Sequence, residues 1–248
     1  LLPSLIYVPR SHQAVVGFGA AKRYIAENVG RAIRYERRYV GDIEIVVAGT
    51  GGSPIVYNES IYAYEDVEAP GRFLQSVKTV LRDETYNGTF IFQKHYKAQD
   101  LIGLVLAHAK EQAERDLGKS ITHAVLGRPV IFSEEPSIDG QAQRILYDAA
   151  RDVGFKDVTF ELEPVAAAYS YHVQADQRQT ALVFDFGGGT LDFTVVRLGG
   201  AQAPEVIATQ GVLLGGDDID RRIVRALEKY FGAGTTFQPG MGRQELPF

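Results

Sequence analysis

Short apolar runs alternate along the chain with stretches whose apolar residues recur every three or four positions. The pattern therefore predicts a succession of strands and helices. The runs typical of strands are residues 4–8, 14–18, 43–48, 53–64, 122–132, 158–163, 180–186, 191–198 and 204–211. Helical spacing is found over residues 19–35, 71–82, 101–117, 139–155, 164–173 and 215–232. Because strands and helices alternate through the second half, the pattern indicates an α/β protein.

Several of the expected helices have a clear face or a clear end. Asp100 is placed to cap the helix that follows it, and Gly118 is placed to end that helix. The helix over residues 139–155 has an apolar face made of Ala142, Ile145, Leu146, Ala149 and Val153. The last helix is expected to turn five residues inward, namely Ile219, Ile223, Ala226, Leu227 and Tyr230.

Composition narrows the class of protein. The 248 residues are enough for one large domain or two small ones with a sizeable core. A formal net charge of -5 argues against a broad nucleic-acid surface, which needs a basic face. Because cysteine is absent, disulfides, thiolate metal sites and thiol nucleophiles are excluded. No apolar run is long enough to span a bilayer. We therefore expect neither nucleic acid nor membrane as a partner, and a cytoplasmic location.

One stretch, "ALVFDFGGGTLDFTVV" (residues 181–196), carries the candidate chemistry. Two apolar strands are joined by three glycines and Thr190, which predicts a tight hairpin. Glycines leave the backbone amides free to approach a ligand closely, and successive amides in a turn form a concavity that binds anions. The Thr190 hydroxyl adds a donor. The turn over Gly187, Gly188 and Gly189 is therefore a candidate phosphate site.

Two acids flank this turn although phosphate is itself negative. Asp185 lies at the end of the incoming strand and Asp192 on the returning strand, so both can face the same ion. A hydrated Mg²⁺ resolves the conflict, since carboxylates hold the metal through its waters and the metal takes phosphate oxygens. The alternative is a purely structural hairpin whose two acidic side chains are exposed to solvent. No P-loop lysine motif is present, and the triplet does not fit the dinucleotide fingerprint.

The motif resembles the second phosphate loop of the actin-like ATPases, and most closely that of the seventy-kilodalton heat-shock chaperones. The resemblance extends to "LEPVAAAYSY", "LLGGDDIDRRIV" and "LGKSITHAVLGRPVIF", and more loosely to "LLPSLIYV" and "GFGAAK". It covers residues 73–232 closely and residues 1–25 loosely. Residues 30–72 and the tail are more similar to the divergent bacterial YegD-like branch. The implied fold is the actin-like ATPase (ribonuclease H-like) nucleotide-binding fold, here incomplete at both ends.

The resemblance implies specific roles. Lys22 would place the attacking water, although a solvated surface lysine is the alternative. Glu163 would hold a metal-bound water, although an acid favoured at a helix start is the alternative. The remaining implied residues are Asp185 and Asp192 for metal water and the attacking water, Thr190 for the γ-phosphate, and Gly187, Gly188, Gly189, Gly215 and Gly216 around the phosphates. The implied ligands are ATP or ADP with Mg²⁺.

The resemblance also implies an organisation. Residues 1–97 would form the outer part of the first lobe, residues 98–175 its core, and residues 176–248 the start of the second lobe. The first phosphate loop and the adenosine-binding segment would lie outside the chain, so we expect an exposed sheet edge and weak or absent hydrolysis by this piece. Client polypeptides or co-chaperones would bind through the missing regions. The alternative functions are a non-catalytic, nucleotide-gated binding module and a sugar kinase of the same superfold.

Overall fold

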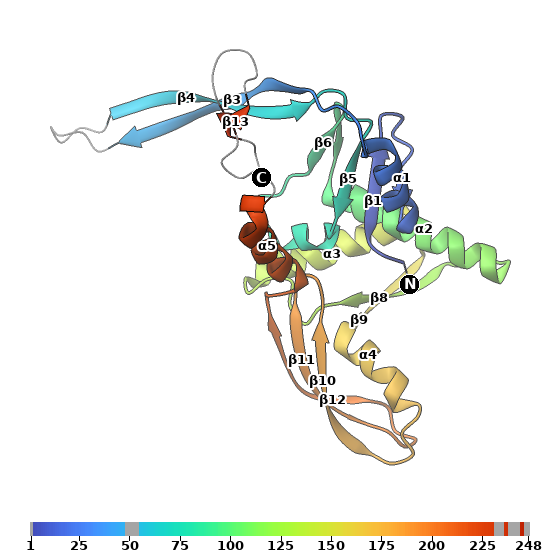
Figure 1. The fold of residues 1–248 in the computed structure, drawn as a ribbon. Helices are drawn as coiled ribbons and strands as arrows, with labels where there is room; N and C mark the ends of the chain where they lie inside the picture. Colours follow the sequence, from blue (N-terminus) through green and yellow to red (C-terminus); the bar gives the residue numbers. More distant parts are fainter. Residues whose placement is uncertain (1, 48–54, 231–235, 238–243, 246–248) are drawn as a thin grey trace. The chain divides into compact units, whose positions relative to one another are not determined.

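The computed structural model describes residues 2–47, 55–230, 236–237 and 244–245 (Figure 1). The chain divides into two compact units, the first made of residues 1–24 and 71–227 and the second of residues 25–70 and 228–248. The predicted boundaries at residues 98 and 176 both fall inside the first unit, and the three-part organisation stays a prediction.

The first unit contains three principal sheets and the helices that pack on them. Its strands are β1 (Leu5–Pro9), β2 (Val15–Val16), β5 (Gly71–Gln75), β6 (Thr89–Ile91), β7 (Lys94–Tyr96), β8 (His123–Arg128), β9 (Asp157–Leu162), β10 (Gln179–Phe186), β11 (Leu191–Leu198) and β12 (Glu205–Val212). Its helices are the first part of α1 (Phe18–Asn28), the 3₁₀ helix η1 (Val77–Arg82), α2 (Ala98–Leu117), α3 (Pro136–Asp152), α4 (Glu163–His172) and α5 (Gly216–Leu227).

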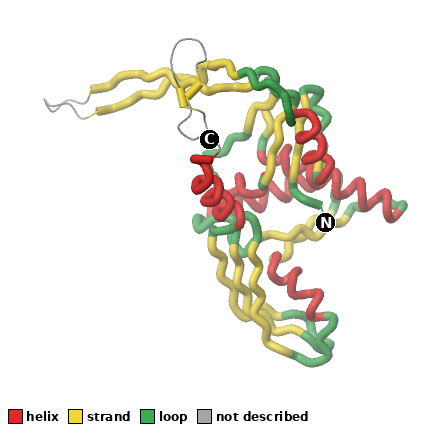
Figure 2. Tube along the Cα trace, viewed as in Figure 1, coloured by secondary structure: helices red, strands yellow, loops and turns green. Residues whose placement is uncertain are grey.

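The sheets differ in the direction of their strands. The order β2-β1-β5 is antiparallel throughout, β8 and β9 form a parallel pair, and β10-β11-β12 is an antiparallel meander. Helix α4 lies against one face of the meander, where it covers Val196 and Leu198 (Figure 2). The mixture of helices and sheets agrees with the expected α/β class.

A second apolar core joins η1, α2 and α3. Its buried residues are Leu81, Ala98, Ile102, Phe132, Ala142, Leu146 and Ala149. Three of these residues belong to the face predicted for α3, and Ile145 packs against the same cluster. Asp100 accepts a hydrogen bond of 2.8 Å from the backbone amide of Lys97, and α2 ends at Gly118 in a left-handed conformation. The apolar face of α3 and the stop at Gly118 were predicted correctly, whereas α2 begins at Ala98, so Asp100 lies in its first turn and not at the predicted cap position.

The prediction of a helix over residues 71–82 is wrong for the first part of this range, and the second part forms the 3₁₀ helix η1. Residues Gly71–Gln75 form β5, which pairs in register with β1, and Ser76 takes a left-handed conformation before η1 begins. The edge of β1 offers five residues a continuous ladder of backbone bonds, and a helix there would leave that edge unpaired. Tertiary pairing overrides the helical spacing.

The first predicted helix is too long. Helix α1 ends at Asn28, and Gly30 has a φ of 75° that a helix cannot contain. The chain from Tyr35 onward is extended. Val29 and Ile33, two apolar residues within the range of the predicted helix, are 75% and 58% exposed.

The inward face predicted for the last helix is also wrong. Helix α5 is strongly amphipathic, yet none of its residues is buried. Ile219, Ile223 and Leu227 are 46%, 51% and 38% exposed, and Tyr230 lies beyond the helix in η2. Among the described residues of the first unit, no element covers this apolar face.

The second unit is built around one long hairpin. Strand β3 (Tyr35–Val47) pairs antiparallel with β4 (Ile55–Asp66), with an irregularity between Tyr39 and Gly41. The unit also contains the end of α1, η2 (Glu228–Tyr230), β13 (Thr236–Phe237) and β14 (Gln244–Glu245). The connection between the two strands, residues 48–54, lies outside the described residues. Within the described ranges, no helix combines the length and the hydropathy that crossing a membrane requires.

Candidate functional site

The first unit contains a cleft of about 350 Å³ beside the glycine turn. One wall is the turn itself and another is η1, and the first residues of α4 and α5 complete it. The residues that line it include Lys78, Thr79, Arg82, Pro129, Phe132, Glu163, Gly187, Gly188, Gly189, Thr190, Asp217 and Asp220. The sequence placed the glycines, Thr190 and Glu163 at one site, and the structure brings them together.

The glycine turn is held from one side by the start of α5. The Gly216 amide donates to the Gly187 carbonyl and the Asp217 amide donates to the Gly188 carbonyl, each at 2.9 Å. A Cβ on Gly215 would lie 2.2 Å from the Gly188 carbonyl oxygen, so only glycine allows this approach. The predicted pair Gly215 and Gly216 therefore positions the turn through direct backbone contact.

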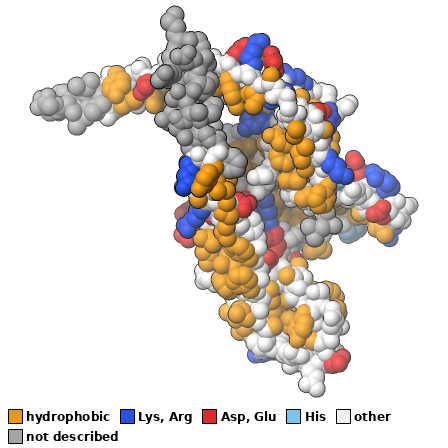
Figure 3. All heavy atoms as spheres, viewed as in Figure 1, with side chains coloured by type: hydrophobic (Ala, Val, Ile, Leu, Met, Phe, Trp, Pro, Cys, Tyr) orange, Lys and Arg blue, Asp and Glu red, His pale blue; other side chains and the backbone are white. Residues whose placement is uncertain are grey.

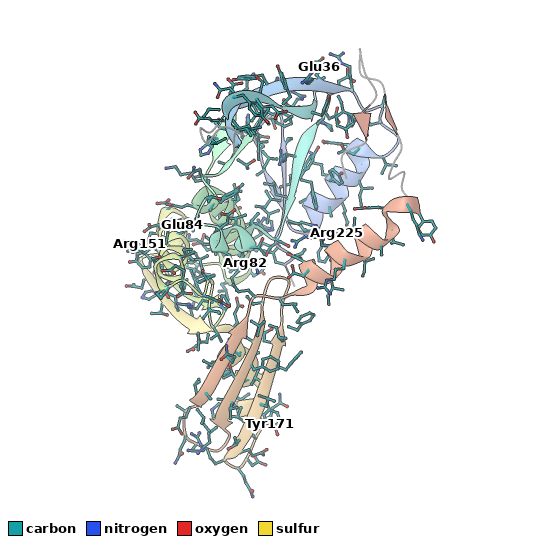
Figure 4. The ribbon with its side chains drawn as sticks, turned by 90° about the vertical axis from the view of Figure 1, so that its left-hand side faces the viewer. Glu36, Arg82, Glu84, Arg151, Tyr171 and Arg225 are labelled. Atoms are coloured by element: carbon teal, nitrogen blue, oxygen red, sulfur yellow. The ribbon has the colours of Figure 1, made fainter. Side chains whose placement is uncertain are left out.

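The other side of the turn is held by η1. Arg82 donates from Nη1 to the Gly189 carbonyl at 2.8 Å, and Figure 4 shows Arg82 beside the turns of the meander. A Cβ on Gly189 would lie 3.1 Å from the Thr79 methyl group. Sequence reasoning missed both residues because it assigned residues 71–82 to an ordinary helix. No motif marks them, and their role depends on where β5 leaves η1.

The lysine in the cleft is Lys78. Its ammonium group pairs with the carboxylate of Glu163, the first residue of α4, and the two side chains are 40% and 33% exposed. The pair can therefore be reached by a ligand. Lys22 instead lies on the exposed surface of α1 and does not line the cleft. The structure thus does not bring the predicted lysine to the site and brings another in its place.

Asp185 and Asp192 are direct cross-strand partners in the β10–β11 ladder, as the motif suggested. Burial raises the pKa of the Asp185 carboxyl, and the Glu163 charge raises it further, whereas Lys78 opposes the shift. Burial likewise raises the pKa of Asp192, which is 1% exposed, against hydrogen bonds from the Thr190 side chain and the Val130 backbone. The carboxyl groups of Glu163, Asp185 and Asp192 thus interact electrostatically, and of the three only Glu163 is among the residues that line the cleft.

Asp192 has an unsatisfied oxygen. Its Oδ1 is buried and has no hydrogen-bond partner. A Cβ on Gly211, which faces Asp192 across the β11–β12 ladder, would lie only 2.8 Å from that oxygen. A buried carboxylate oxygen without a donor is costly, so the site favours a cation or a water held by one.

The donor set fits a hydrated cation better than a directly ligated one. In the part of the chain that the structure describes, no three acidic or histidine side chains are grouped to hold a metal ion directly. The interacting carboxyl groups of Glu163, Asp185 and Asp192 and the unsatisfied Asp192 oxygen still favour a bound cation. Mg²⁺ usually keeps several of its waters, which is compatible with this arrangement.

Comparison with known proteins identifies the family. The Hsp70 protein model matches residues 68–239. The chain is 36% identical over 157 residues to the chaperone protein dnaK3 of Synechococcus elongatus and, equally, to the chaperone protein DnaK 1 of a Synechococcus strain. Each alignment covers 62% of this chain and 20% of the relative, so the chain spans about a fifth of their length. Placement in the YegD-like branch stays a prediction. The chain belongs to the Hsp70 family and carries part of its actin-like ATPase fold.

Proposed function

We propose that the cleft binds the phosphates of ATP or ADP together with Mg²⁺ and serves as the ATPase core of a heat-shock-type chaperone. The observation that carries the proposal is the convergence of the glycine turn and the Lys78–Glu163 pair at one cleft, with the paired Asp185 and Asp192 close enough to Glu163 to interact with its charge. The family and the names of the matched relatives, both chaperone proteins, support it.

Phosphate binding follows from the turn. Its glycines expose backbone groups that α5 and η1 hold in place. Binding of an anion therefore requires little further ordering of the turn. Lys78 and Arg82 supply positive charge along the η1 wall. Asp217 and Asp220 also line the cleft, which disfavours a bare phosphate and favours a complex that carries its own cation.

The metal completes the charge balance. Asp185, Asp192 and Glu163 would hold Mg²⁺ through its water molecules, and the ion would supply positive charge at the phosphate oxygens. The unsatisfied Oδ1 of Asp192 and the raised pKa values of both aspartates support this assignment. The carboxylates would then orient water without entering covalent chemistry.

Hydrolysis would depend on positioning and charge stabilisation. We assign the role that the resemblance implied for Lys22 to Lys78, whose ammonium group lies in the cleft and is held by Glu163. The Thr190 hydroxyl would contact the terminal phosphate from the turn. Glu163 fixes the direction of the lysine, so its loss would act partly through Lys78.

The test is isothermal titration calorimetry of the chain with ADP and Mg²⁺, comparing Lys78→Ala with Lys22→Ala. Loss of the cleft lysine should weaken binding by about ten-fold or more, which corresponds to about 1.4 kcal/mol. Lys22→Ala is the matched control, since it removes the same charge from an exposed helix surface.

Equal affinities for both variants and the parent chain would overturn the assignment of Lys78. Binding of ADP that does not depend on Mg²⁺ would overturn the metal assignment. Phosphate release from ATP separates the functions, because tight binding without any release supports the nucleotide-gated module over the ATPase.

A further inference from the structure

The β3–β4 hairpin stands apart from the shared family segment. The family match begins at residue 68, whereas the hairpin occupies Tyr35–Asp66. Its strands are 13 and 12 residues long, about twice the usual length. Among the described residues, β3 and β4 pair only with each other. The hairpin thus lies outside the matched segment, and within the described residues no third strand pairs with it.

The hairpin exposes an unusual amount of apolar surface. Cross-strand pairs place Ile43, Ile45, Tyr57 and Ile61 on one face, and the three of these with large exposure are 43%, 49% and 40% exposed. Val46 and Val56, a pair on the other face, are 58% and 52% exposed. Figure 3 shows apolar side chains together with acidic ones along it. Two strands without a core are marginally stable in water, so this surface favours a further strand.

The edge of β4 lacks the features that usually block strand addition. Proteins protect edge strands with lysine, proline, bulges or short strands. Strand β3 has an irregularity at Tyr39–Gly41 and two arginines. Strand β4 is regular over its twelve residues and contains no lysine, arginine, proline or glycine. Over residues 56–62, β4 is therefore the edge that carries none of these blocking features.

The negative charge of the β3–β4 hairpin and its flanking residues indicates which kind of partner it binds. From Tyr39 to Gly71 the chain has no lysine or arginine. The same segment carries six acids, namely Asp42, Glu44, Glu59, Glu65, Asp66 and Glu68. In the described structure, Asp42, Glu44 and Glu59 are not part of any ion pair. Hydrogen bonds from Ser60 and then Tyr39 lower the pKa of Asp42, so that carboxylate stays ionised.

We propose that the edge of β4 binds an extended polypeptide segment rich in basic and aliphatic residues, which adds to the hairpin as a third strand. Backbone hydrogen bonds to β4 supply affinity, as in other cases of strand addition. Glu44 on one face of the hairpin and Glu59 on the other attract the basic side chains, and the face that Glu59 shares with Ile43, Tyr57 and Ile61 packs against the aliphatic ones. A second copy of this chain is disfavoured because its own hairpin carries the same excess of acids.

The test measures binding of a fluorescently labelled peptide of alternating lysine and valine, about as long as β4, by fluorescence anisotropy. A peptide of alternating glutamate and valine is the charge control. The double variant Glu44→Lys with Glu59→Lys reverses the charge on the hairpin without breaking a described ion pair. Its matched control is Glu134→Lys with Asp148→Lys, which changes the net charge equally at two exposed positions of the first unit.

A shortened hairpin provides a second variant. Gly41 and Ile61 are cross-strand partners, so residues 42–60 can be replaced by an Asn-Gly turn without changing the register of the rest. The hairpin double variant and the shortened chain should each weaken binding of the lysine peptide by about ten-fold or more, while the matched control keeps it. Amide hydrogen exchange should slow in residues 56–62 of β4 when the peptide binds.

Other outcomes overturn the proposal. An equal loss in the matched control would mean non-specific attraction to an acidic protein. Full binding by the shortened chain would place the peptide elsewhere, and slower exchange in β3 alone would exclude the β4 edge. A dimer that sedimentation detects in the parent chain and loses in the shortened chain, with no peptide binding, would make the second copy the occupant.

Discussion

Two antiparallel hairpins of this chain, β10–β11 and β3–β4, use the same backbone pairing in opposite ways. The β10–β11 hairpin is packed by α4 on one face, where Val196 and Leu198 are 0% and 1% exposed. Its turn is bonded to α5 and to η1. The β3–β4 hairpin keeps large apolar side chains exposed on both faces.

The difference shows what makes a hairpin suitable for small-molecule binding or for strand addition. A phosphate needs amides fixed in direction, so the turn must be immobilised by its neighbours. An added strand needs the reverse, namely a free edge with its backbone groups available. Packing around each hairpin therefore decides its use.

The largest expected effect comes from breaking the immobilised turn. In Gly215→Val, the added Cβ meets the Gly188 carbonyl oxygen at 2.2 Å, so α5 must move away from the turn. Overpacking of this kind costs about 1–3 kcal/mol, and it also releases the amides that face the cleft. Urea unfolding should show the loss of stability, and calorimetry should show weaker binding of ADP with Mg²⁺.

Gly140→Ala is the matched control. Gly140 lies inside α3, where an added Cβ has nothing within 4 Å. Alanine in a helix interior should stabilise the chain by up to about 1 kcal/mol and leave nucleotide binding unchanged. If both glycine variants bind equally well, contact with α5 does not position the turn.

The same contrast explains what the sequence could predict. The expected strand over residues 191–198 coincides with β11, and β10 begins one residue before the expected start. The alternating apolar residues and the glycine triplet are local signals, and the hairpin register then follows from the short turn. The cross-strand placement of Asp185 and Asp192 was predictable for the same reason.

The predictions that were wrong concerned residues whose positions depend on contacts between distant segments. Lys78 reaches the cleft because Gly71–Gln75 pairs with β1, about seventy residues earlier in the chain, and helical spacing could not reveal that. The amphipathic pattern of α5 was recognised, but a pattern does not say which neighbour is present. The length of the β3–β4 hairpin was underestimated because residues 36–42, between the predicted helix and the predicted strand, are mostly charged and show no apolar run.

A smaller effect is expected at the η1 side of the turn. Arg82→Ala removes the bond to the Gly189 carbonyl and one positive charge from the cleft. Binding of ADP with Mg²⁺ should weaken about three- to ten-fold, since the net contribution of a typical hydrogen bond is about 0.5–1.5 kcal/mol. Arg144→Ala, on the exposed surface of α3, should leave affinity unchanged. An unchanged affinity in both variants would reduce Arg82 to a surface contact.

The smallest expected effect concerns the base of the β3–β4 hairpin. Asp66 pairs with Arg31, and their side chains are 15% and 21% exposed. The Arg31 hydrogen bond lowers the pKa of Asp66, so the pair contributes stability above the unfolded pKa of about 3.9 and loses it as pH falls through the folded value. Asp66→Asn should therefore destabilise the hairpin by about 0.5–1 kcal/mol at neutral pH.

Amide hydrogen exchange can measure this locally, because the second unit opens independently of the first wherever their contacts are few. Exchange of β3 and β4 amides should be faster in Asp66→Asn than in the parent chain at neutral pH, and the ratio should approach one in acid. Exchange in β11 should not change, since its protection comes from packing in the first unit. A uniform change in both hairpins would mean that they unfold together, and the contrast between an immobilised hairpin and an independent one would then fail.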